Sequence, residues 1–285
     1  MLNNSSVLIL GSGASIPFDD DKFQNSGCGL DEQFTSIIRN SYSIGLNYFY
    51  KYGCPTTLTT FVDAKFYLGD KRDLSQLPFI IGKQDKLLTD ISTNTLLFPI
   101  GRQYMGEHAW NIKYKMCKQC SHKIPLNDLK VNCPNCKSNL IPCGFYHSHL
   151  NGIFSLSLAI ALGFKTVYLF GYDGCGKDGK THFYQNQVQD MEKFRGVGTV
   201  KHPKGQSYRT STYNSPDKMN KIWFAPFKDL NINIYNVSPT SVIEVFPKIT
   251  YEQFYKQVAE NQAINQDQAR LEIKDYIKKK IGEVC

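Results

Sequence analysis

Two pairs of cysteines constrain the middle of this chain. Two residues separate Cys117 from Cys120 and Cys133 from Cys136, and twelve residues lie between the pairs. This spacing lets one tight turn aim two thiolates at the same ion, and four thiolates complete a tetrahedral shell with no open position for substrate. We therefore expect a structural Zn²⁺ site, with four unligated thiols as the alternative. The other five cysteines show no paired spacing.

The composition indicates a folded protein. The chain has 285 residues, of which 41% are hydrophobic and 20% charged, enough to bury one large core or two modest ones. The longest apolar run, at about 150–164, is too short to span a bilayer and contains polar residues. Four metal-bound cysteines and a start without signal-peptide features favour a cytoplasmic location. The net charge of +8 suggests an anionic partner.

The pattern of apolar runs predicts an α/β fold. Residues 7–10 form a continuous apolar run that ends in Gly11-Ser12-Gly13-Ala14-Ser15, which is typical of a buried parallel strand entering a tight turn. Further strands are predicted at 57–62, 79–81, 96–100, 166–170 and 233–237. Helices are predicted at about 31–39, 44–51, 149–163, 217–228 and 251–281. We expect a Rossmann-like, mostly parallel sheet with helices on both faces.

The cysteine pairs interrupt this series, which suggests an insertion. We divide the chain into a Rossmann-like domain at 1–110 and 144–250, a zinc-ribbon insertion at 111–143, and a C-terminal helix at 251–285. The stretch from about 174 to 216 is long, polar and aperiodic, as in loops that close over a site.

Several polar residues follow predicted strands, where open α/β sheets place their ligands. The small residues Gly11, Ser12 and Gly13 would let a phosphate approach the backbone, although a purely structural turn is an alternative. Asn47 and Asp63 would lie beside that turn, or act only as caps. In the loop after residues 166–170, Asp173 and His182 could form a general-base pair. Tyr184 lies in the same loop.

The order of these pieces resembles a known group of enzymes. The residues 148–173, Ser-His-Leu-Asn-Gly-Ile-Phe-Ser-Leu-Ser-Leu-Ala-Ile-Ala-Leu-Gly-Phe-Lys-Thr-Val-Tyr-Leu-Phe-Gly-Tyr-Asp, are similar to bacterial lipooligosaccharide sialyltransferases and to the MptE-like Rossmann family. The similarity extends to the glycine turn, to Asn47 and Asp63, and to Asn236-Val-Ser-Pro-Thr-Ser241. It covers nearly the whole chain except the zinc insertion and the C-terminal helix.

The resemblance implies a transferase that displaces a nucleotide from an activated donor, in the first place a glycosyltransferase that uses a nucleotide sugar. It places the glycine turn at the phosphate, and Asn47 and Asp63 on the phosphate or sugar side of the donor. The start of the central helix and a late turn would hold the nucleotide, through Ser148, Asn151, Gly152, Ser238, Pro239 and Ser241.

The chain departs from the sialyltransferase pattern at the base. The histidine expected before the penultimate helix is replaced by Tyr213-Asn214, so His182 or Asp173 would deprotonate the acceptor. Tyr184, Tyr208 and Tyr213 would supply hydroxyls to the leaving phosphate. An MptE-like diphosphokinase that uses ATP and Mg²⁺, with Asp63 and Asp173 on the metal side, is an alternative.

The zinc insertion permits a third, non-enzymatic alternative. Residues 111–140 contain six lysines and one acid, which leaves the zinc-loaded segment near +3. A basic ribbon can contact phosphate backbones, so a nucleic-acid-binding protein with a degenerate pocket is compatible with the sequence, as is a ribbon that only staples loops or forms dimer contacts. The acceptor, a nucleic acid or a glycan, and any homo-oligomer are left open.

Overall fold

The computed structural model describes residues 5–98, 109–110, 114–117, 119–125, 127–142, 144–146, 150–174, 183, 218–259, 261 and 263–282. Seven strands form a parallel sheet in the order β10-β9-β1-β2-β3-β4-β5. The bounds are β1 Ser6–Leu10, β2 Tyr42–Leu46, β3 Leu58–Phe61, β4 Ile80–Lys83, β5 Thr95–Phe98, β9 Thr166–Phe170 and β10 Asn233–Asn236. The predicted α/β, Rossmann-like fold is confirmed.

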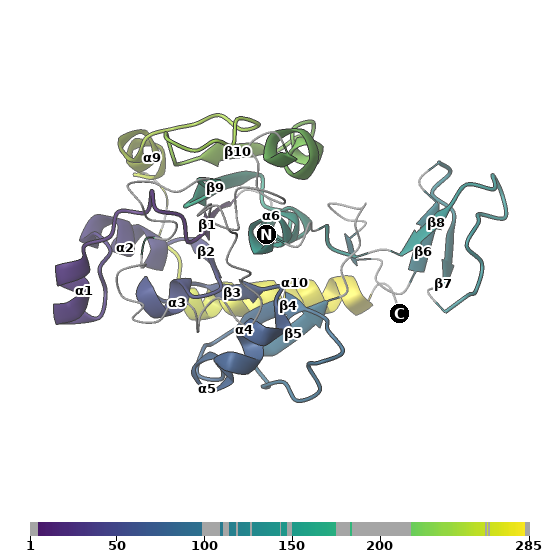
Figure 1. Cartoon of the computed structure of the whole chain (residues 1–285), viewed down its shortest axis with the longest axis horizontal. Helices are drawn as coiled ribbons and strands as arrows, with labels where there is room; N and C mark the ends of the chain where they lie inside the picture. Colours follow the sequence, from purple (N-terminus) through teal and green to yellow (C-terminus); the bar gives the residue numbers. More distant parts are fainter. Residues whose placement is uncertain are drawn as a thin grey trace, which may run out of the picture.

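Helices cover both faces of this sheet (Figure 1). Successive residues of a strand point to opposite faces, so Val7 and Ile9 of β1 pack in one core cluster and Leu8 and Leu10 in another. The first cluster includes α6 (Asn151–Ala161) and α10 (Gln266–Gly282), and the second includes α2 (Glu32–Arg39) and α9 (Tyr251–Val258). The remaining α-helices are short: α1 Asp20–Ser26, α3 Phe49–Tyr52, α4 Ala64–Gly69 and α5 Lys71–Leu74.

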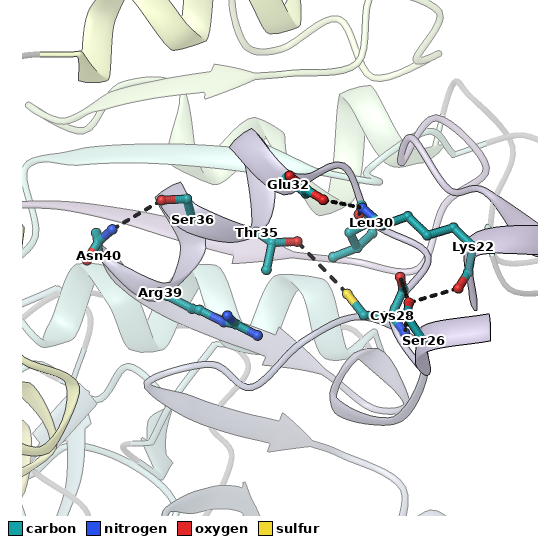
Figure 2. Close-up of a pocket in the computed structure, with 9 residues that line it drawn as sticks. All are labelled: Lys22, Ser26, Cys28, Leu30, Glu32, Thr35, Ser36, Arg39 and Asn40. Carbon is teal, nitrogen blue, oxygen red and sulfur yellow. Dashed lines mark hydrogen bonds and ion pairs between the residues drawn. The ribbon is translucent and has the colours of Figure 1, made fainter. Parts of the chain in front are cut away.

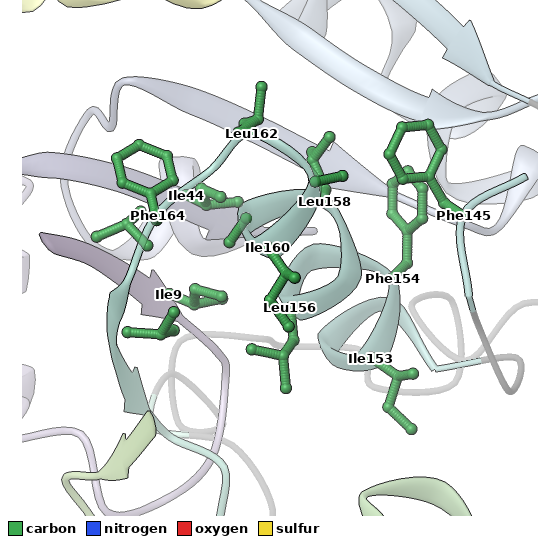
Figure 3. Packing of buried hydrophobic residues seen from close by; sticks show 14 of the residues in the cluster. Ile9, Ile44, Phe145, Ile153, Phe154, Leu156, Leu158, Ile160, Leu162 and Phe164 are labelled. Carbon is green, nitrogen blue, oxygen red and sulfur yellow. The ribbon is translucent and has the colours of Figure 1, made fainter. Parts of the chain in front are cut away.

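The central helix α6 is buried nearly all round. Leu156 and Ile160 lie on one side of the helix and Leu158 on nearly the opposite side, and all three are buried in a cluster that includes Ile9, Ile44 and Phe145 (Figure 3). A helix that is apolar on all sides is stable only inside a core. The predicted buried helix at 149–163 is therefore confirmed, with bounds two residues shorter at each end.

Three sequence-based helix predictions are wrong. Residues 44–51 were expected to be helical, but Tyr42–Leu46 form β2, all five residues of which are buried, and only Phe49–Tyr52 are helical. Ser43 and Gly45 interrupt the apolar run and hide the strand. Ser43 is tolerated there because its hydroxyl accepts a hydrogen bond from the backbone amide of Thr57.

The other two errors concern helix breaks. The segment at 217–228 forms a π-turn at Met219–Trp223 followed by a 3₁₀ turn at Ala225–Phe227, where Pro226 has no amide to donate. The predicted helix at 251–281 is two helices. Asn265 starts the second, because its side chain accepts from the backbone amides of Asp267 and Gln268.

A second, antiparallel sheet lies at one end of the molecule (Figure 1). It has the order β7-β6-β8, with β6 at Tyr114–Cys117, β7 at Lys123–Pro125 and β8 at Leu140–Pro142. The insertion inferred from the sequence is thus a small sheet of its own. By contrast, α10 lies across the seven-stranded sheet and places Ala269, Ile273 and Ile277 in the main core.

Candidate active site and metal centre

The order of strands fixes where a ligand would bind. From β1 the chain moves outward through β2 to β5, then returns to place β9 on the other side of β1. Such a reversal is a topological switch point, and open α/β sheets bind ligands outside the carboxyl ends of the two strands that flank it. Here these ends are Gly11–Ser15 after β1 and Gly171–Asp173 after β9, together called the β1–β9 junction.

The two loops of the β1–β9 junction are hydrogen-bonded to each other. The amide of Gly11 donates to the carbonyl of Phe170 at 2.7 Å, and that of Gly13 donates to the carbonyl of Gly171 at 3.0 Å. A β-carbon at position 13 would lie 2.5 Å from both the Gly171 carbonyl oxygen and Oδ2 of Asp173. Glycine is therefore required at this position by the β9 loop itself.

These bonds limit what the glycine turn can offer a phosphate. The amides of Gly11, Gly13 and Ser15 already donate to the β9 loop. Within the described residues, the amides of Ser12 and Ala14 make no hydrogen bond. A phosphate at this turn would depend on those two donors and on the close approach that the glycines allow.

Asp173 connects the loops of the β1–β9 junction through hydrogen bonds. Its side chain is buried, with Oδ2 accepting from the Ser15 amide at 2.7 Å and Oδ1 from the Ser238 hydroxyl. Its backbone carbonyl accepts from the amide of Val242 at 2.9 Å. Ser241 donates from its hydroxyl to the carbonyl of Tyr172 at 2.6 Å. The predicted turn at 238–241 is therefore held beside the junction, and both carboxylate oxygens of Asp173 are occupied.

Asn47 and Asn151 meet at the adjoining part of the same edge. Asn47 follows β2 with a left-handed φ of 49°, and its Oδ1 accepts from Nδ2 of Asn151 at 2.9 Å. The same Nδ2 donates to the carbonyl of Thr60 at 2.8 Å. Oδ1 of Asn151 is buried and has no hydrogen-bond partner within the described part of the chain. A buried acceptor without a partner is rare, and it offers a bond to a ligand donor.

The start of α6 faces this edge. Asn151 and Gly152 are its first two residues, and the N-cap position, Leu150, makes no side-chain capping hydrogen bond. Tyr172 packs against Gly152, where an added β-carbon would lie 2.9 Å from the ring, and its hydroxyl donates to the Gly152 carbonyl at 2.8 Å. Burial raises the pKa of Tyr172 well above its usual value, so it stays a neutral donor.

Asp63 plays a local role at the end of β3. Its side chain accepts from the amide of Lys65 at 2.9 Å and caps α4. The residue is exposed, in contrast to buried Asp173. Among the described residues, no group of three or more metal-ligating side chains forms at this edge.

Sequence reasoning missed two contributors. Thr60 receives the Asn151 side chain through its carbonyl, and its hydroxyl lies 2.7 Å from that of Ser155 on α6. Tyr251 lies far along the chain, yet its hydroxyl donates to the carbonyl of Ser15 at 3.4 Å. Burial, and after it the charge of Asp173, raises the pKa of Tyr251. Polar residues inside the apolar run at 57–62 were the one sequence signal for Thr60.

Five predicted site residues lie outside the described residues: Ser148, His182, Tyr184, Tyr208 and Tyr213. One neighbour of this group is described. The amide of Phe183 donates to the carbonyl of Ser12 at 3.1 Å, and the Phe183 ring packs between Phe18 and Phe49.

The four cysteines of the ribbon come together as predicted. Their sulfur atoms lie within 4.8 Å of one another, with Cys117 to Cys136 at 3.3 Å and Cys120 to Cys133 at 3.5 Å. Tetrahedral Zn–S bonds of about 2.3 Å would require sulfur separations of about 3.8 Å, so the set fits one ion.

Each cysteine pair is built by the same local turn. The amide of Cys117 donates to the carbonyl of His122, and the amide of Cys133 to that of Ser138. The residue after each pair, Ser121 or Lys137, has a positive φ. This repeated turn points both sulfurs of a pair to one side. Hydrogen bonds from the Ser138 backbone and from the Cys117 thiol lower the pKa of Cys136 to about 6.

Two of the ribbon lysines are engaged within the ribbon. Nζ of Lys115 donates to the carbonyl of Asp128 at 2.5 Å and to that of Lys130 at 3.3 Å. Lys130 lies 3.8 Å from the Asp128 carboxylate. Lys118 lies outside the described residues. Lys115 and Lys130 therefore lend no support to a basic surface of the ribbon that would bind nucleic acid.

Comparisons with known proteins add little to this geometry. The sequence matches no protein-family model and no curated protein. Among solved structures, the chain shows low similarity to a Sir2 in complex with an inhibitor, 2'-O-acetyl-ADP-ribose and a deacetylated peptide, with a TM-score of 0.19, 12% identity, and coverage of 90% of this chain and 93% of that chain. For Sir2Af2 bound to a myristoylated histone peptide the TM-score is 0.19 and the identity 12%, with coverage of 99% and 95%.

TM-scores this low support no argument about fold or function. None of the helices in the described part of the chain is long and apolar enough to cross a membrane.

Proposed function

We propose that this chain is a transferase that displaces a nucleotide from an activated donor, and specifically a glycosyltransferase that uses a nucleotide sugar. One observation carries the proposal. The switch point between β1 and β9 lies beside Asn47, Asn151 and the uncapped start of α6, and Oδ1 of Asn151 is buried without a partner in the described chain. A ligand that donates to a buried acceptor of this kind would satisfy it.

In this proposal the donor lies across the carboxyl edge. Amides at the start of α6 and the helix dipole attract the donor phosphates, supported by the free amides of the glycine turn. Oδ1 of Asn151 accepts from the base or the sugar of the donor. Asn47 holds Asn151 in this orientation through the 2.9 Å hydrogen bond. Asp63 lines the sugar side of the donor, and the turn at 238–241 lines its nucleotide side.

The proposed base is His182, with Asp173 as a positioning residue. A base needs an open oxygen or nitrogen within reach of the acceptor hydroxyl, and both oxygens of Asp173 already accept from Ser15 and Ser238. Phe183 follows His182 in the chain, and its backbone amide donates a hydrogen bond to the carbonyl of Ser12 in the glycine turn. Tyr184 and Tyr213 are proposed to donate to the departing phosphate.

The occupied carboxylate of Asp173 and the capping role of Asp63 lend no support to the Mg²⁺-dependent diphosphokinase. For the ribbon we propose one structural Zn²⁺ held by Cys117, Cys120, Cys133 and Cys136. The site is closed by four sulfurs, so the ion stabilises the three-stranded sheet and takes no part in transfer.

The test is a thermal-shift panel of CMP-, UDP-, GDP- and ADP-linked sugars, with ATP and Mg²⁺ as a further arm. A donor that binds the native state stabilises it by about 2.7 kcal/mol at 100 times its Kd, which is a shift of several degrees. We expect one donor class to shift the wild type. Asn151→Ala should lose most of that shift, measured against the melting temperature of the variant itself.

Asn25→Ala provides the matched control, because Asn25 is exposed on α1 and its side chain bonds only locally, to the carbonyl of Asp21. It should keep the full donor shift. No shift with any sugar nucleotide would refute the proposal, and a shift with ATP that requires Mg²⁺ would favour the diphosphokinase instead.

A further inference from the structure

A pocket lies between α1 and α2, and none of its lining residues belongs to the proposed donor site. It has a volume of about 430 Å³, within the range of small-molecule sites. Lys22 of α1, Cys28 of the connecting loop, and Thr35 and Arg39 of α2 surround it (Figure 2).

Two cations face this pocket from different elements. The guanidinium of Arg39 points toward Thr35 and Cys28 (Figure 2), and within the described chain it makes no hydrogen bond or ion pair. Nζ of Lys22 donates to the carbonyl of Leu30 at 3.0 Å, which leaves further N–H donors available. The pocket thus presents N–H donors of a guanidinium and an ammonium group.

One carboxylate opposes these cations, but only weakly. Oε1 of Glu32 lies 3.9 Å from Nζ of Lys22, and the Glu32 side chain is 94% exposed. An exposed ion pair at this distance is screened by water. The thiol of Cys28 lies 3.9 Å from the hydroxyl of buried Thr35, so this part of the wall carries no charge. The local charge is therefore positive at the place where a ligand would sit.

We propose that this pocket binds a small oxyanion, either a carboxylate or a phosphate group. The planar fork of an arginine matches two oxygens of such a group, and the ammonium of Lys22 would neutralise it from the other side. The inference goes beyond the proposed transfer reaction and does not depend on it, because the two sites share no residue.

Calorimetric titration of the 285-residue chain with sodium phosphate and with sodium malonate, at constant ionic strength, tests this inference. The two titrations distinguish a phosphate from a carboxylate ligand. We expect at least one anion to bind with 1:1 stoichiometry, and Arg39→Gln to weaken it tenfold or more. Glu32→Gln should tighten binding two- to fivefold, because Lys22 loses its competing carboxylate.

Arg72→Gln is the control for net charge, since Arg72 is an exposed arginine on α5, outside the pocket. It should leave the affinity unchanged. Equal weakening by Arg39→Gln and Arg72→Gln would show unspecific attraction and overturn the inference, as would the absence of binding by both anions.

Cys28 provides an independent readout, because its thiol lines the pocket and is partly exposed. Alkylation of Cys28 by iodoacetamide, followed by peptide mass spectrometry, should slow at least threefold when the bound anion is saturating. Cys54, which is buried, should react slowly in both conditions. An unchanged rate at Cys28 would place the anion elsewhere and contradict the proposal.

Discussion

The backbone amide of Ser15 donates a 2.7 Å hydrogen bond to Oδ2 of Asp173, a residue 158 positions further along the chain. This bond joins the loops that follow β1 and β9, the two strands at the switch point. The other oxygen of Asp173 accepts from Ser238, which follows β10. One buried carboxylate thus connects three loops at the carboxyl edge of the sheet.

Replacing this carboxylate should destabilise the protein. In Asp173→Asn, one of the two donors, the Ser15 amide or the Ser238 hydroxyl, would face an NH₂ group instead of an oxygen. A buried donor left unsatisfied costs about 1–3 kcal/mol, which urea denaturation can measure. Asp63→Asn is the control, because asparagine caps helices about as well as aspartate, and it should change stability by less than about 0.5 kcal/mol. An equal loss of stability in the two variants would contradict the proposed role of Asp173 in connecting these loops.

Gly13→Ala should be costly because the added methyl group has no space. Its β-carbon would lie 2.5 Å from two oxygens, those of Gly171 and of the Asp173 carboxylate. Overpacking of this kind costs about 1–3 kcal/mol, and here it would also separate the two loops. Gly69→Ala is the matched control, since nothing lies within 4 Å of its β-carbon at the end of α4. If chemical denaturation gave both variants the stability of the wild type, Gly13 would not lie as close to the β9 loop as described.

The ribbon should contain one zinc ion per chain. Elemental analysis of purified protein should give about one equivalent, and Cys133→Ser should lose most of it because three thiolates leave the shell incomplete. Cys28→Ser changes a cysteine outside the cluster and should retain the metal. Wild-type protein without metal, or Cys133→Ser with a full equivalent, would argue for unligated thiols.

Tyr42 joins β2 to α10 through a 2.6 Å hydrogen bond to the carboxylate of Glu272. This bond lowers the pKa of Glu272 below its value of 4.5 in the unfolded chain. A lowered pKa means that the bond contributes its full stability above pH 4.5 and loses it as the pH falls through the folded-state pKa. Because Glu272 is exposed, we expect Tyr42→Phe to cost only about 0.5–1 kcal/mol at pH 7.

The difference between Tyr42→Phe and the wild type should shrink as the pH is lowered below 4.5. Urea denaturation at pH 7 and at pH 3 measures both differences. A difference that stays constant between these values would mean that the Glu272 charge does not contribute to the bond.

The elements with strong local signals were predictable from sequence. The apolar run at 7–10, the runs at 96–100 and 166–170 and the central helix form where predicted, because hydrophobic periodicity reports burial directly. The cysteine cluster was predictable for a similar reason, since two short turns determine the spacing of its ligands. Strand β2 was missed because Ser43 is satisfied by Thr57, a partner that only the folded chain provides.

The fold class, the cluster of four cysteines and the edge of the sheet at which polar residues gather were therefore predictable from the sequence. What those polar residues do there depends on the folded chain. Asp173 was a candidate base by sequence, but Ser15 and Ser238 donate to both its oxygens, whereas Oδ1 of Asn151 has no partner among the described residues. A local hydrophobic pattern indicates which side of a strand or helix is buried. Whether a polar atom is still open to a ligand depends on partners more than 50 residues away, because long-range hydrogen bonds form only when the strands and helices pack together.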